Sequence, residues 1–394
     1  MFPEQSLAWG QSNNVIRKLA AYAAARKAQI GAENVFDFTI GSPSVPAPQA
    51  VTDALVELVT NTSPVQLHDY TPAVGLPSLR KRIAEDLNSR YNAGISPEMV
   101  FVTCGAAAGL VGCCRGLLNR GDEAIALAPF FPEYRVFVEG AGGELVVCAP
   151  HADMQPDMEN FENSITEKTK LVIVNSPNNP SGVILTADSL STIAYILRRA
   201  EKKYGHPIYL VADEPYRELL FDGSSPLCIT HFYENSIICY SFSKSLSLPG
   251  ERIGYLAVSD KMADKALVFA SIVGALRGCG YVNAPSLMQR LIERCIGQTS
   301  DISAYKHNRD LLYNGLTELG FECVKPDGAF YLFMKSPEAD ARAFSERAKK
   351  YELLLVPSDD FGVKGYVRIA YCVAESTIKN SMPAFRKLAE EYGI

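Results

Sequence analysis

The chain has 394 residues, of which 47% are hydrophobic and 21% are charged, and its formal net charge is −6. This length suits two to three domains, and the composition is that of an ordinary globular protein. The acidic balance and the absence of a basic run argue against nucleic acid as a partner. No apolar run is long enough to span a membrane, and residues 1–11 lack the features of a signal peptide, so we expect a cytoplasmic protein without a membrane partner.

The ten cysteines are scattered between Cys104 and Cys372, and none forms a C-x-x-C pair. This spacing predicts reduced, buried thiols and no metal site.

The first predicted element is a helix over residues 12–30, in which apolar residues recur near a 3.6-residue period. Residues 41–48 carry three prolines and are predicted to be an extended linker where the chain crosses between domains.

Short apolar runs then alternate with helical segments from about residue 50 to residue 260. Several runs are apolar at nearly every position, which is typical of strands that are buried on both faces. The pattern therefore predicts an α/β fold with a mostly parallel seven-stranded sheet flanked by helices. The expected strands are Val100–Thr103, Ala124–Ala128, Glu144–Cys148, Leu171–Asn175, Ile208–Ala212, Ile237–Ser241 and Gly254–Val258.

A long helical stretch is expected after Pro285, and a smaller α+β unit after Gly320. The elements expected in this unit are strand Ala329–Met334, helix Ala339–Tyr351, strands Leu353–Pro357 and Tyr366–Tyr371, and a final helix from Glu375. We predict a large domain over 46–300 and a small α+β domain built from both termini, 1–45 and 301–394.

Ligands of an open parallel sheet bind at the carboxyl ends of its strands. Gly105, Ala106 and Ala107 follow the first strand and open a helix, where free N–H groups bind anions, although such a turn is also common packing. Phe131 follows the second strand and could stack on a flat ring or fill the core. Asp213 directly follows a buried strand, where a carboxylate needs a cationic partner or caps the next element.

A loop that carries several hydroxyl groups, a lysine and an arginine follows the strand that ends at Ser241. It contains hydroxyl groups, including that of Ser243, together with Lys244 and Arg252. Such a loop can hold a phosphate and offer an amine as a nucleophile.

The Lys244 segment resembles the Schiff-base lysine signature of class I aminotransferases, which are fold type I pyridoxal-phosphate enzymes. The resemblance covers nearly the whole chain, and seven motifs in the same order make chance a poor explanation. These motifs are Gly41-Ser42-Pro43, Tyr70-Thr71-Pro72 with Gly75 and Leu79-Arg80, Gly105-Ala106, Asn175 to Gly182, Asp213 with Tyr216, Gly328-Ala329-Phe330-Tyr331, and Arg368.

The resemblance implies a catalytic role for Lys244, which bonds to pyridoxal 5'-phosphate and moves protons at the substrate. It implies that Asp213 keeps the pyridine nitrogen protonated. Tyr216 and Asn179 would bind the phenolic oxygen of the ring, and Phe131 would stack on it.

The phosphate would rest on Gly105, Ala106 and Ala107, with Ser241, Ser243 and Arg252 completing its site. In the family a tyrosine that matches Tyr70 reaches this phosphate from the other subunit, which implies a homodimer with shared active sites. Arg368 would bind the α-carboxylate of the substrate, with Asn179 and the backbone of Gly41 beside it.

The sequence departs from the family at three positions beside the cofactor site, which weakens any transfer of a relative's substrate preference to this chain. Phe131 stands where many relatives have Trp or Tyr, Ala107 where many have Lys or another polar residue, and Glu251 where Trp is frequent. In some aspartate aminotransferases an arginine near the position of Arg277 binds the distal carboxylate of the substrate, although a surface role for Arg277 is equally open. Our hypothesis is that dicarboxylic or aromatic amino acids are donors and that a 2-oxo acid is the acceptor.

Three other functions compete with transamination. A carbon–sulfur β-lyase would use the same Lys, Asp and Arg, so the sequence separates it poorly from a transaminase. A non-catalytic regulator would carry a DNA-binding domain ahead of the first linker, where only about forty residues without a basic recognition helix stand. A dinucleotide-binding oxidoreductase is disfavoured because no G-x-G-x-x-G follows a strand.

Overall fold

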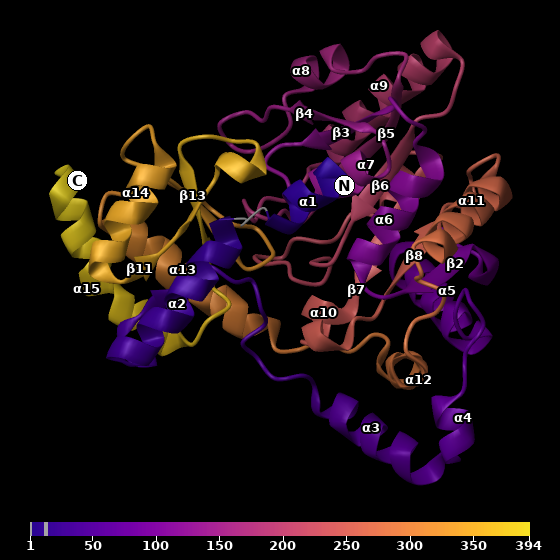
Figure 1. Ribbon diagram of the computed structural model, residues 1–394, viewed down its shortest axis with the longest axis horizontal. Helices are drawn as coiled ribbons and strands as arrows, with labels where there is room; N and C mark the ends of the chain where they lie inside the picture. The colour runs from indigo at the N-terminus through magenta and orange to yellow at the C-terminus, as the bar shows by residue number, and fades with distance from the viewer. Residues whose placement is uncertain (1, 12–14) are drawn as a thin grey trace.

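The computed structural model describes residues 2–11 and 15–394, and its larger sheet has seven strands in the order β2-β8-β7-β6-β5-β3-β4 (Figure 1). Strand β8 runs antiparallel to both of its neighbours, and the other neighbouring pairs are parallel. The predicted mostly parallel seven-stranded sheet is therefore confirmed. The strands are β2 (Val100–Thr103), β3 (Glu123–Leu127), β4 (Glu144–Cys148), β5 (Thr169–Asn175), β6 (Tyr209–Asp213), β7 (Ser236–Ser241) and β8 (Gly254–Val258).

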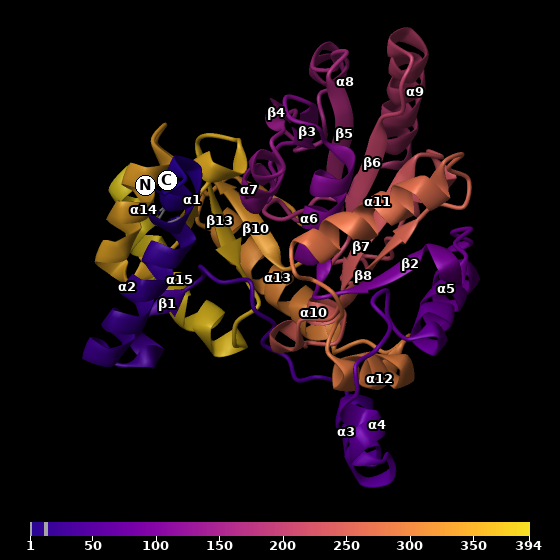
Figure 2. The ribbon, with the colours of Figure 1, turned by 45° about the vertical axis from the view of Figure 1, so that its right-hand side comes forward.

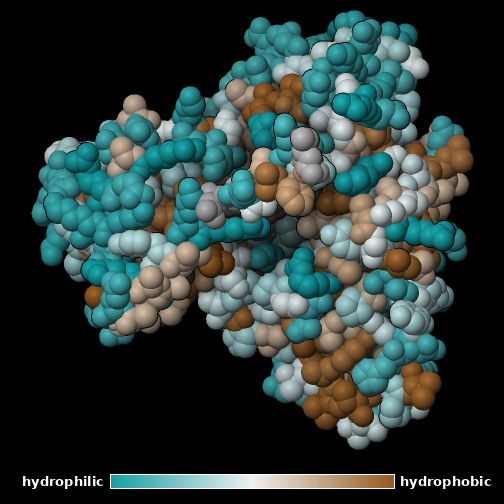
Figure 3. All heavy atoms as spheres, in the orientation of Figure 1, coloured by the Kyte–Doolittle hydropathy of each residue, from teal (hydrophilic) through white to brown (hydrophobic). Residues whose placement is uncertain are grey.

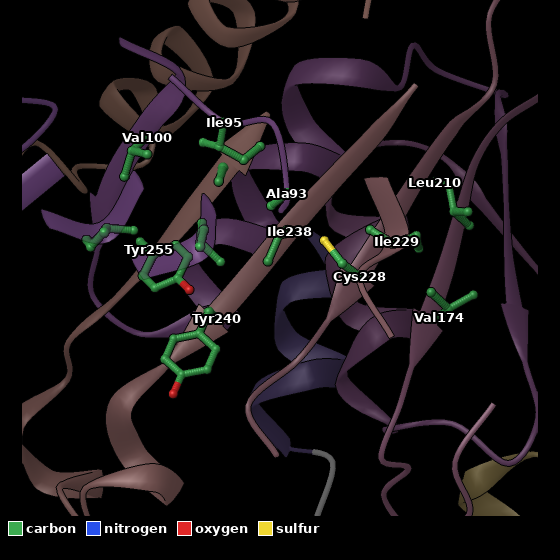
Figure 4. Close-up of a cluster of buried hydrophobic side chains, with 14 of the residues drawn as sticks. Ala93, Ile95, Val100, Val174, Leu210, Cys228, Ile229, Ile238, Tyr240 and Tyr255 are labelled. Atoms are coloured by element: carbon green, nitrogen blue, oxygen red, sulfur yellow. The ribbon is translucent and has the colours of Figure 1, made fainter. Parts of the chain in front are cut away.

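Helices cover both faces of this sheet, which explains why its strands are apolar at successive positions. Val172 and Val174 of β5 pack in the core under α9, whereas Leu171 and Ile173 pack in a second core under α6 and α11. Figure 4 shows part of the first core, with side chains from several neighbouring strands directed to the same side of the sheet. The helices are α6 (Ala106–Leu117), α7 (Glu133–Gly140), α8 (Met158–Asn163), α9 (Ala187–Tyr204) and α11 (Lys265–Gly278).

A smaller four-stranded antiparallel sheet, in the order β12-β13-β10-β9, lies beside the larger one (Figure 2). The N-terminal strand β1 (Phe36–Asp37) pairs in parallel with β11 (Leu353–Leu354), so the smaller α+β part is built from both ends of the chain, as predicted. Its other elements are α2 (Val15–Ile30), α13 (Ile302–Glu318), β9 (Cys323–Val324), β10 (Tyr331–Lys335), α14 (Ala341–Ala348), β12 (Val356–Pro357), β13 (Tyr366–Ala370) and α15 (Glu375–Tyr392).

Several predicted elements have different bounds in the structure. The strand predicted over Leu353–Pro357 is two strands, because β11 pairs with β1 and β12 pairs with β13. The long helical stretch after Pro285 is interrupted between α12 (Ser286–Cys295) and α13, where Gly297 has a positive φ of 87°. The helix predicted over 12–30 corresponds to α2 from Val15 to Ile30, and the first three residues of the prediction lie outside the described residues.

The N-terminal helix α1 (Glu4–Gln11) was not predicted. Helices α3 (Gln49–Asn61) and α4 (Pro64–His68) project from the body of the molecule and contact it mainly through α12 (Figure 1). Among the described residues no helix is both long and apolar enough to cross a membrane.

Candidate active site

The functional side chains gather at one edge of the larger sheet, where the parallel strands have their carboxyl ends. Strand β5 ends at Asn175, β6 at Asp213 and β7 at Ser241. Because β8 runs in the opposite direction, its first residues reach the same edge and bring Arg252 there. This is the position at which open α/β sheets bind their ligands.

A cavity of about 320 Å³ opens at this edge between the two sheets, and Figure 3 shows the molecular face hollowed there. Its volume suits a small-molecule ligand. Twelve of the residues singled out in the sequence line it, namely Gly41, Ala106, Ala107, Phe131, Asn179, Asp213, Tyr216, Ser241, Ser243, Lys244, Arg252 and Arg368.

Lys244 lies in α10 (Phe242–Ser245), the short helix that directly follows β7. Its Nζ donates a hydrogen bond to the backbone carbonyl of Gly41 at 2.7 Å. Burial, and to a smaller extent the charges of Arg252 and Arg368, lower the pKa of the Lys244 amine to about 8. The lowered pKa increases the share of this amine that is unprotonated near neutral pH, and the unprotonated form is the one that attacks a carbonyl carbon.

Asp213 is buried at the end of β6 and has two differently placed oxygens. Its Oδ2 accepts a hydrogen bond of 2.5 Å from the hydroxyl of Tyr134, whereas its Oδ1 is buried and has no hydrogen-bond partner in the protein. Burial raises the pKa of Asp213 to about 7, and the hydrogen bond from Tyr134 acts in the opposite direction. An unpaired, buried carboxylate oxygen on a cavity wall calls for a ligand group that donates a proton.

Tyr216 and Tyr331 meet on the far wall of the cavity, where their hydroxyl groups are 3.0 Å apart. Tyr331 comes from β10 of the smaller sheet, so this contact joins the two parts of the molecule. Gly41 leaves room for it, because a Cβ atom at position 41 would stand 1.9 Å from the Tyr331 hydroxyl.

One end of the cavity is suited to an anion. Gly105 has a φ of 83° and caps α6, so the first N–H groups of that helix, at Ala106 and Ala107, are free of intrahelical partners. The hydroxyl groups of Ser241 and Ser243 lie 2.8 Å apart beside them. The Arg252 guanidinium approaches the same cap, since a Cβ atom on Gly105 would lie 2.9 Å from its Nη2.

Arg368 occupies the opposite end of the cavity, on β13, and its side chain is buried. Its Nη1 donates to Oδ1 of Asn179 at 3.2 Å and its Nη2 donates to the backbone carbonyl of Thr39, but its Nε has no partner. No carboxylate of residues 2–11 or 15–394 forms an ion pair with it. A buried guanidinium without a counter-ion is suited to bind a carboxylate ligand.

Three of the predicted site residues are not in the cavity lining, namely Gly105, which caps α6 at the border of the cavity, Tyr70 and Arg277. Tyr70 has 92% of its side chain exposed, and Arg277 is exposed in the last turn of α11. Conversely, the structure adds residues to which we assigned no role, including Tyr134, Asn175 and Tyr331. Asn175 could have been found from its position at a strand end. Its Nδ2 donates a hydrogen bond to the Asp213 carbonyl, and its Oδ1 accepts one from the Asn179 N–H.

The site places a lysine of lowered pKa between a phosphate-sized anion site and an arginine without a counter-ion. Together with the α/β fold, this arrangement is that of an enzyme that acts on a small anionic substrate with a phosphate-bearing cofactor. The sequence matches the aminotransferase class I and II family over residues 33–385, and the chain belongs to this family. Enzymes of this family depend on pyridoxal phosphate. The residues fit that cofactor, since the free Asp213 Oδ1, the Lys244 amine and the α6 cradle match its ring nitrogen, aldehyde and phosphate.

Named relatives are aminotransferases as well. The aspartate/prephenate aminotransferase of Thermus thermophilus is 31% identical over 359 residues, which cover 89% of this chain and 90% of the relative. The crystal structure of an aminotransferase from Eubacterium rectale is 48% identical, covers both chains completely and has a TM-score of 0.97. Thermus thermophilus aspartate aminotransferase with maleate is 26% identical, with a TM-score of 0.87 and coverage of 98% of this chain and 99% of that chain. These findings support a transaminase over the β-lyase alternative.

Proposed function

We propose that this chain transfers the amino group of an L-amino acid to a 2-oxo acid in the cavity at the carboxyl edge of the larger sheet. The observation that carries the proposal is the position of the buried Lys244 amine, in a cavity that also exposes an unpaired Asp213 oxygen and an unpaired Arg368 Nε. These are the three groups that a transaminase needs for its cofactor and for the carboxylate of its substrate.

Pyridoxal phosphate, when bound, supplies the aldehyde that takes up the amino group and a pyridine ring that withdraws electrons from the substrate's Cα. Lys244 would hold the cofactor through its Nζ. Once the substrate amine has replaced it, the free Lys244 amine would accept the proton from Cα and later return it, as a general base and then a general acid. Its lowered pKa, about 8, suits this exchange near neutral pH.

The remaining cofactor contacts follow from the walls of the cavity. Asp213 would hold a proton on the ring nitrogen through its free Oδ1. Tyr216 and Asn179 would donate hydrogen bonds to the phenolic oxygen, and Phe131 would stack on the ring. The phosphate would bind the cradle of Gly105, Ala106, Ala107, Ser241, Ser243 and Arg252.

Arg368 would bind the α-carboxylate of the substrate. Its planar guanidinium can present two N–H groups to the two oxygens of a carboxylate. Asn179 supports one edge of the guanidinium, and Gly41 keeps this end of the cavity open. The substrate's Cα would thus be held near the Lys244 amine.

The test is transfer of the nitrogen itself. With a 15N-labelled amino acid donor and an unlabelled 2-oxo acid, we expect the label in the newly formed amino acid and sustained turnover only while the 2-oxo acid is present. Release of the label as ammonium, without need of an acceptor, would instead establish a lyase.

We also propose a homodimer with shared active sites, for which the structure offers a surface. Val56, Val59 and Val65 on α3 and α4 are 57%, 56% and 80% exposed, and Figure 3 shows the hydrophobic patch over these projecting helices. Tyr70 follows α4 directly. An apolar patch of this kind on an exposed arm supports an interface between subunits.

Tyr70→Phe tests the shared site. We expect this change to weaken pyridoxal-phosphate binding about 10- to 100-fold, because a hydroxyl that donates to a charged phosphate contributes about 1.5–3 kcal/mol. Equilibrium dialysis of the cofactor measures the effect. Tyr195→Phe is the matched control, since Tyr195 is also an exposed tyrosine (60%) but lies on α9. Unchanged binding in Tyr70→Phe would exclude a partner's Tyr70 from the phosphate site.

The donors are proposed to be dicarboxylic or aromatic amino acids, with Arg277 of the partner subunit binding a distal carboxylate. Arg277→Ala is then expected to lower the kcat/KM for aspartate relative to alanine about 10- to 100-fold. A hydrogen bond to a charged group contributes a free energy that corresponds to a change of this size. Arg115→Ala, which removes an exposed arginine of helix α6, should leave the ratio unchanged. An unchanged aspartate-to-alanine ratio in Arg277→Ala would disprove the distal-carboxylate role.

The domain division 46–300 against 1–45 with 301–394 is likewise a proposal. It is supported by separate hydrophobic cores, although Tyr216, Leu219 and Phe221 of the large part pack in the core of the small one.

All ten cysteines are free, which supports the proposed cytoplasmic location.

A further inference from the structure

Tyr134 is the one side chain of the described residues that donates a hydrogen bond to the Asp213 carboxylate. It lies in the first turn of α7, three residues after Phe131, and only 1% of it is exposed. Its ring is fixed by Phe130, with centroids 6.3 Å apart and planes at 18°, and by the edge contact with Phe131 at 5.8 Å and 84°. The hydroxyl is therefore held in place toward Oδ2 of Asp213.

The surroundings of Asp213 leave its charge otherwise unsupported. The titratable groups that face it are Tyr134 from α7, Tyr216 and Glu214 from the turn after β6, and Cys239 from β7. Glu214 adds a like charge, although it is itself paired with Arg217 at 2.5 Å. Among the residues that the structure describes, no lysine or arginine forms an ion pair with Asp213.

We infer that Tyr134 is a positioning residue that keeps Asp213 an anion and leaves only its Oδ1 free for the ring nitrogen of the cofactor. This inference rests on the proposed function, because it takes Asp213 as the partner of that nitrogen. The hydroxyl stays protonated and can donate to Asp213, since burial and the nearby Asp213 charge raise the pKa of Tyr134 well above its ordinary value. It thus opposes the effect of burial, which by itself favours protonated Asp213.

The number of protons that the protein takes up when the cofactor ring binds therefore depends on the charge of Asp213. A complex in which Asp213 and the ring nitrogen share one proton takes up one proton minus the protons that free Asp213 and the free ring already carry, and the contribution of the ring is the same for every variant. With a pKa of about 7, free Asp213 of the wild-type protein is mostly an anion at pH 8, so it contributes to this uptake. Tyr134→Phe removes the donor, so we expect the pKa of Asp213 to rise by about one to two units and the uptake at pH 8 to fall by about half a proton relative to the wild type.

Calorimetric titration in buffers of different ionisation enthalpy measures this uptake on the full chain freed of cofactor. The probe is pyridoxine 5'-phosphate, which has no aldehyde and cannot bond to Lys244. Tyr233→Phe is the matched control, because it also removes a buried hydroxyl, one that donates to the Ile208 carbonyl at 2.8 Å, and it should leave the uptake unchanged.

Asp213→Asn separates failure of this inference from failure of the proposed function. We expect Asp213→Asn to lower the net uptake, because the ring nitrogen then has no carboxylate with which to share a proton, and we expect Tyr134→Phe to add no further change in that background. If Asp213→Asn lowers the uptake and Tyr134→Phe does not, Tyr134 is merely structural and the inference is overturned alone. If Asp213→Asn changes neither uptake nor affinity, Asp213 does not face the ring nitrogen and the proposed site falls with it.

A second variant covers the case in which Tyr134→Phe folds poorly. 3-Fluorotyrosine at position 134 keeps the ring and the hydroxyl but is a stronger donor, so it should raise the uptake at pH 7 above that of the wild type. An unchanged or lower uptake would overturn the inference.

Discussion

Lys244→Ala is expected to lower kcat by about 10⁴-fold or more, because both the covalent attachment and the proton transfer at Cα depend on this amine. No other lysine lines the cavity among the residues that the structure describes. Steady-state transamination at saturating cofactor measures the loss. We expect the Tm of the variant to stay close to that of the wild type, because burial disfavours the charged form of the wild-type amine. The loss of activity would then not result from unfolding.

Lys244→Arg is the matched control for charge. Arginine keeps a positive charge at the same place but is not deprotonated in proteins, so it can neither attack an aldehyde nor accept a proton. We expect it to be as inactive as Lys244→Ala. Substantial activity in Lys244→Arg would mean that position 244 supplies charge rather than amine chemistry.

Arg368→Lys is expected to have the second largest effect, a loss of about 10²- to 10³-fold in kcat/KM for amino acids. Lysine keeps the charge but cannot present two parallel N–H groups to a carboxylate. The change also leaves Asn179 Oδ1 and the Thr39 carbonyl without their present donor. Kinetics with several amino acids should show the same loss for each, because the α-carboxylate is common to all of them.

Arg342→Lys controls for a general cost of replacing an arginine, since Arg342 is exposed and pairs with Asp359 and Asp360 on the surface. It should leave kcat/KM unchanged. A loss below about threefold in Arg368→Lys would place the carboxylate site elsewhere in the cavity.

The larger sheet was predictable because its strands are buried on both faces. Leu171 to Val174 is apolar at every position, since alternate side chains enter two different cores. The candidate site followed from the same reasoning, because residues that come directly after such strands meet at one edge. Asp213 and Lys244 were found in this way from strand ends alone.

Contacts that depend on a helix direction or on a second sheet were not predictable. Tyr134 reaches Asp213 only because α7 turns back over the carboxyl edge, and its sequence neighbours carry no sign of that target. Tyr331 enters the site from β10, more than a hundred residues away from Tyr216. The strand predicted at Leu353–Pro357 was wrong because its two halves pair with different strands, which no local pattern reveals.

A transaminase takes the amino group from its donor and keeps it until an acceptor arrives. The most direct measurement mixes the cofactor-loaded protein with one amino acid, without any 2-oxo acid, and counts the oxo acid formed per subunit. We predict one equivalent, no ammonium, and no further reaction until a 2-oxo acid is added. Oxo acid and ammonium that accumulate over many turnovers without an acceptor would contradict the account.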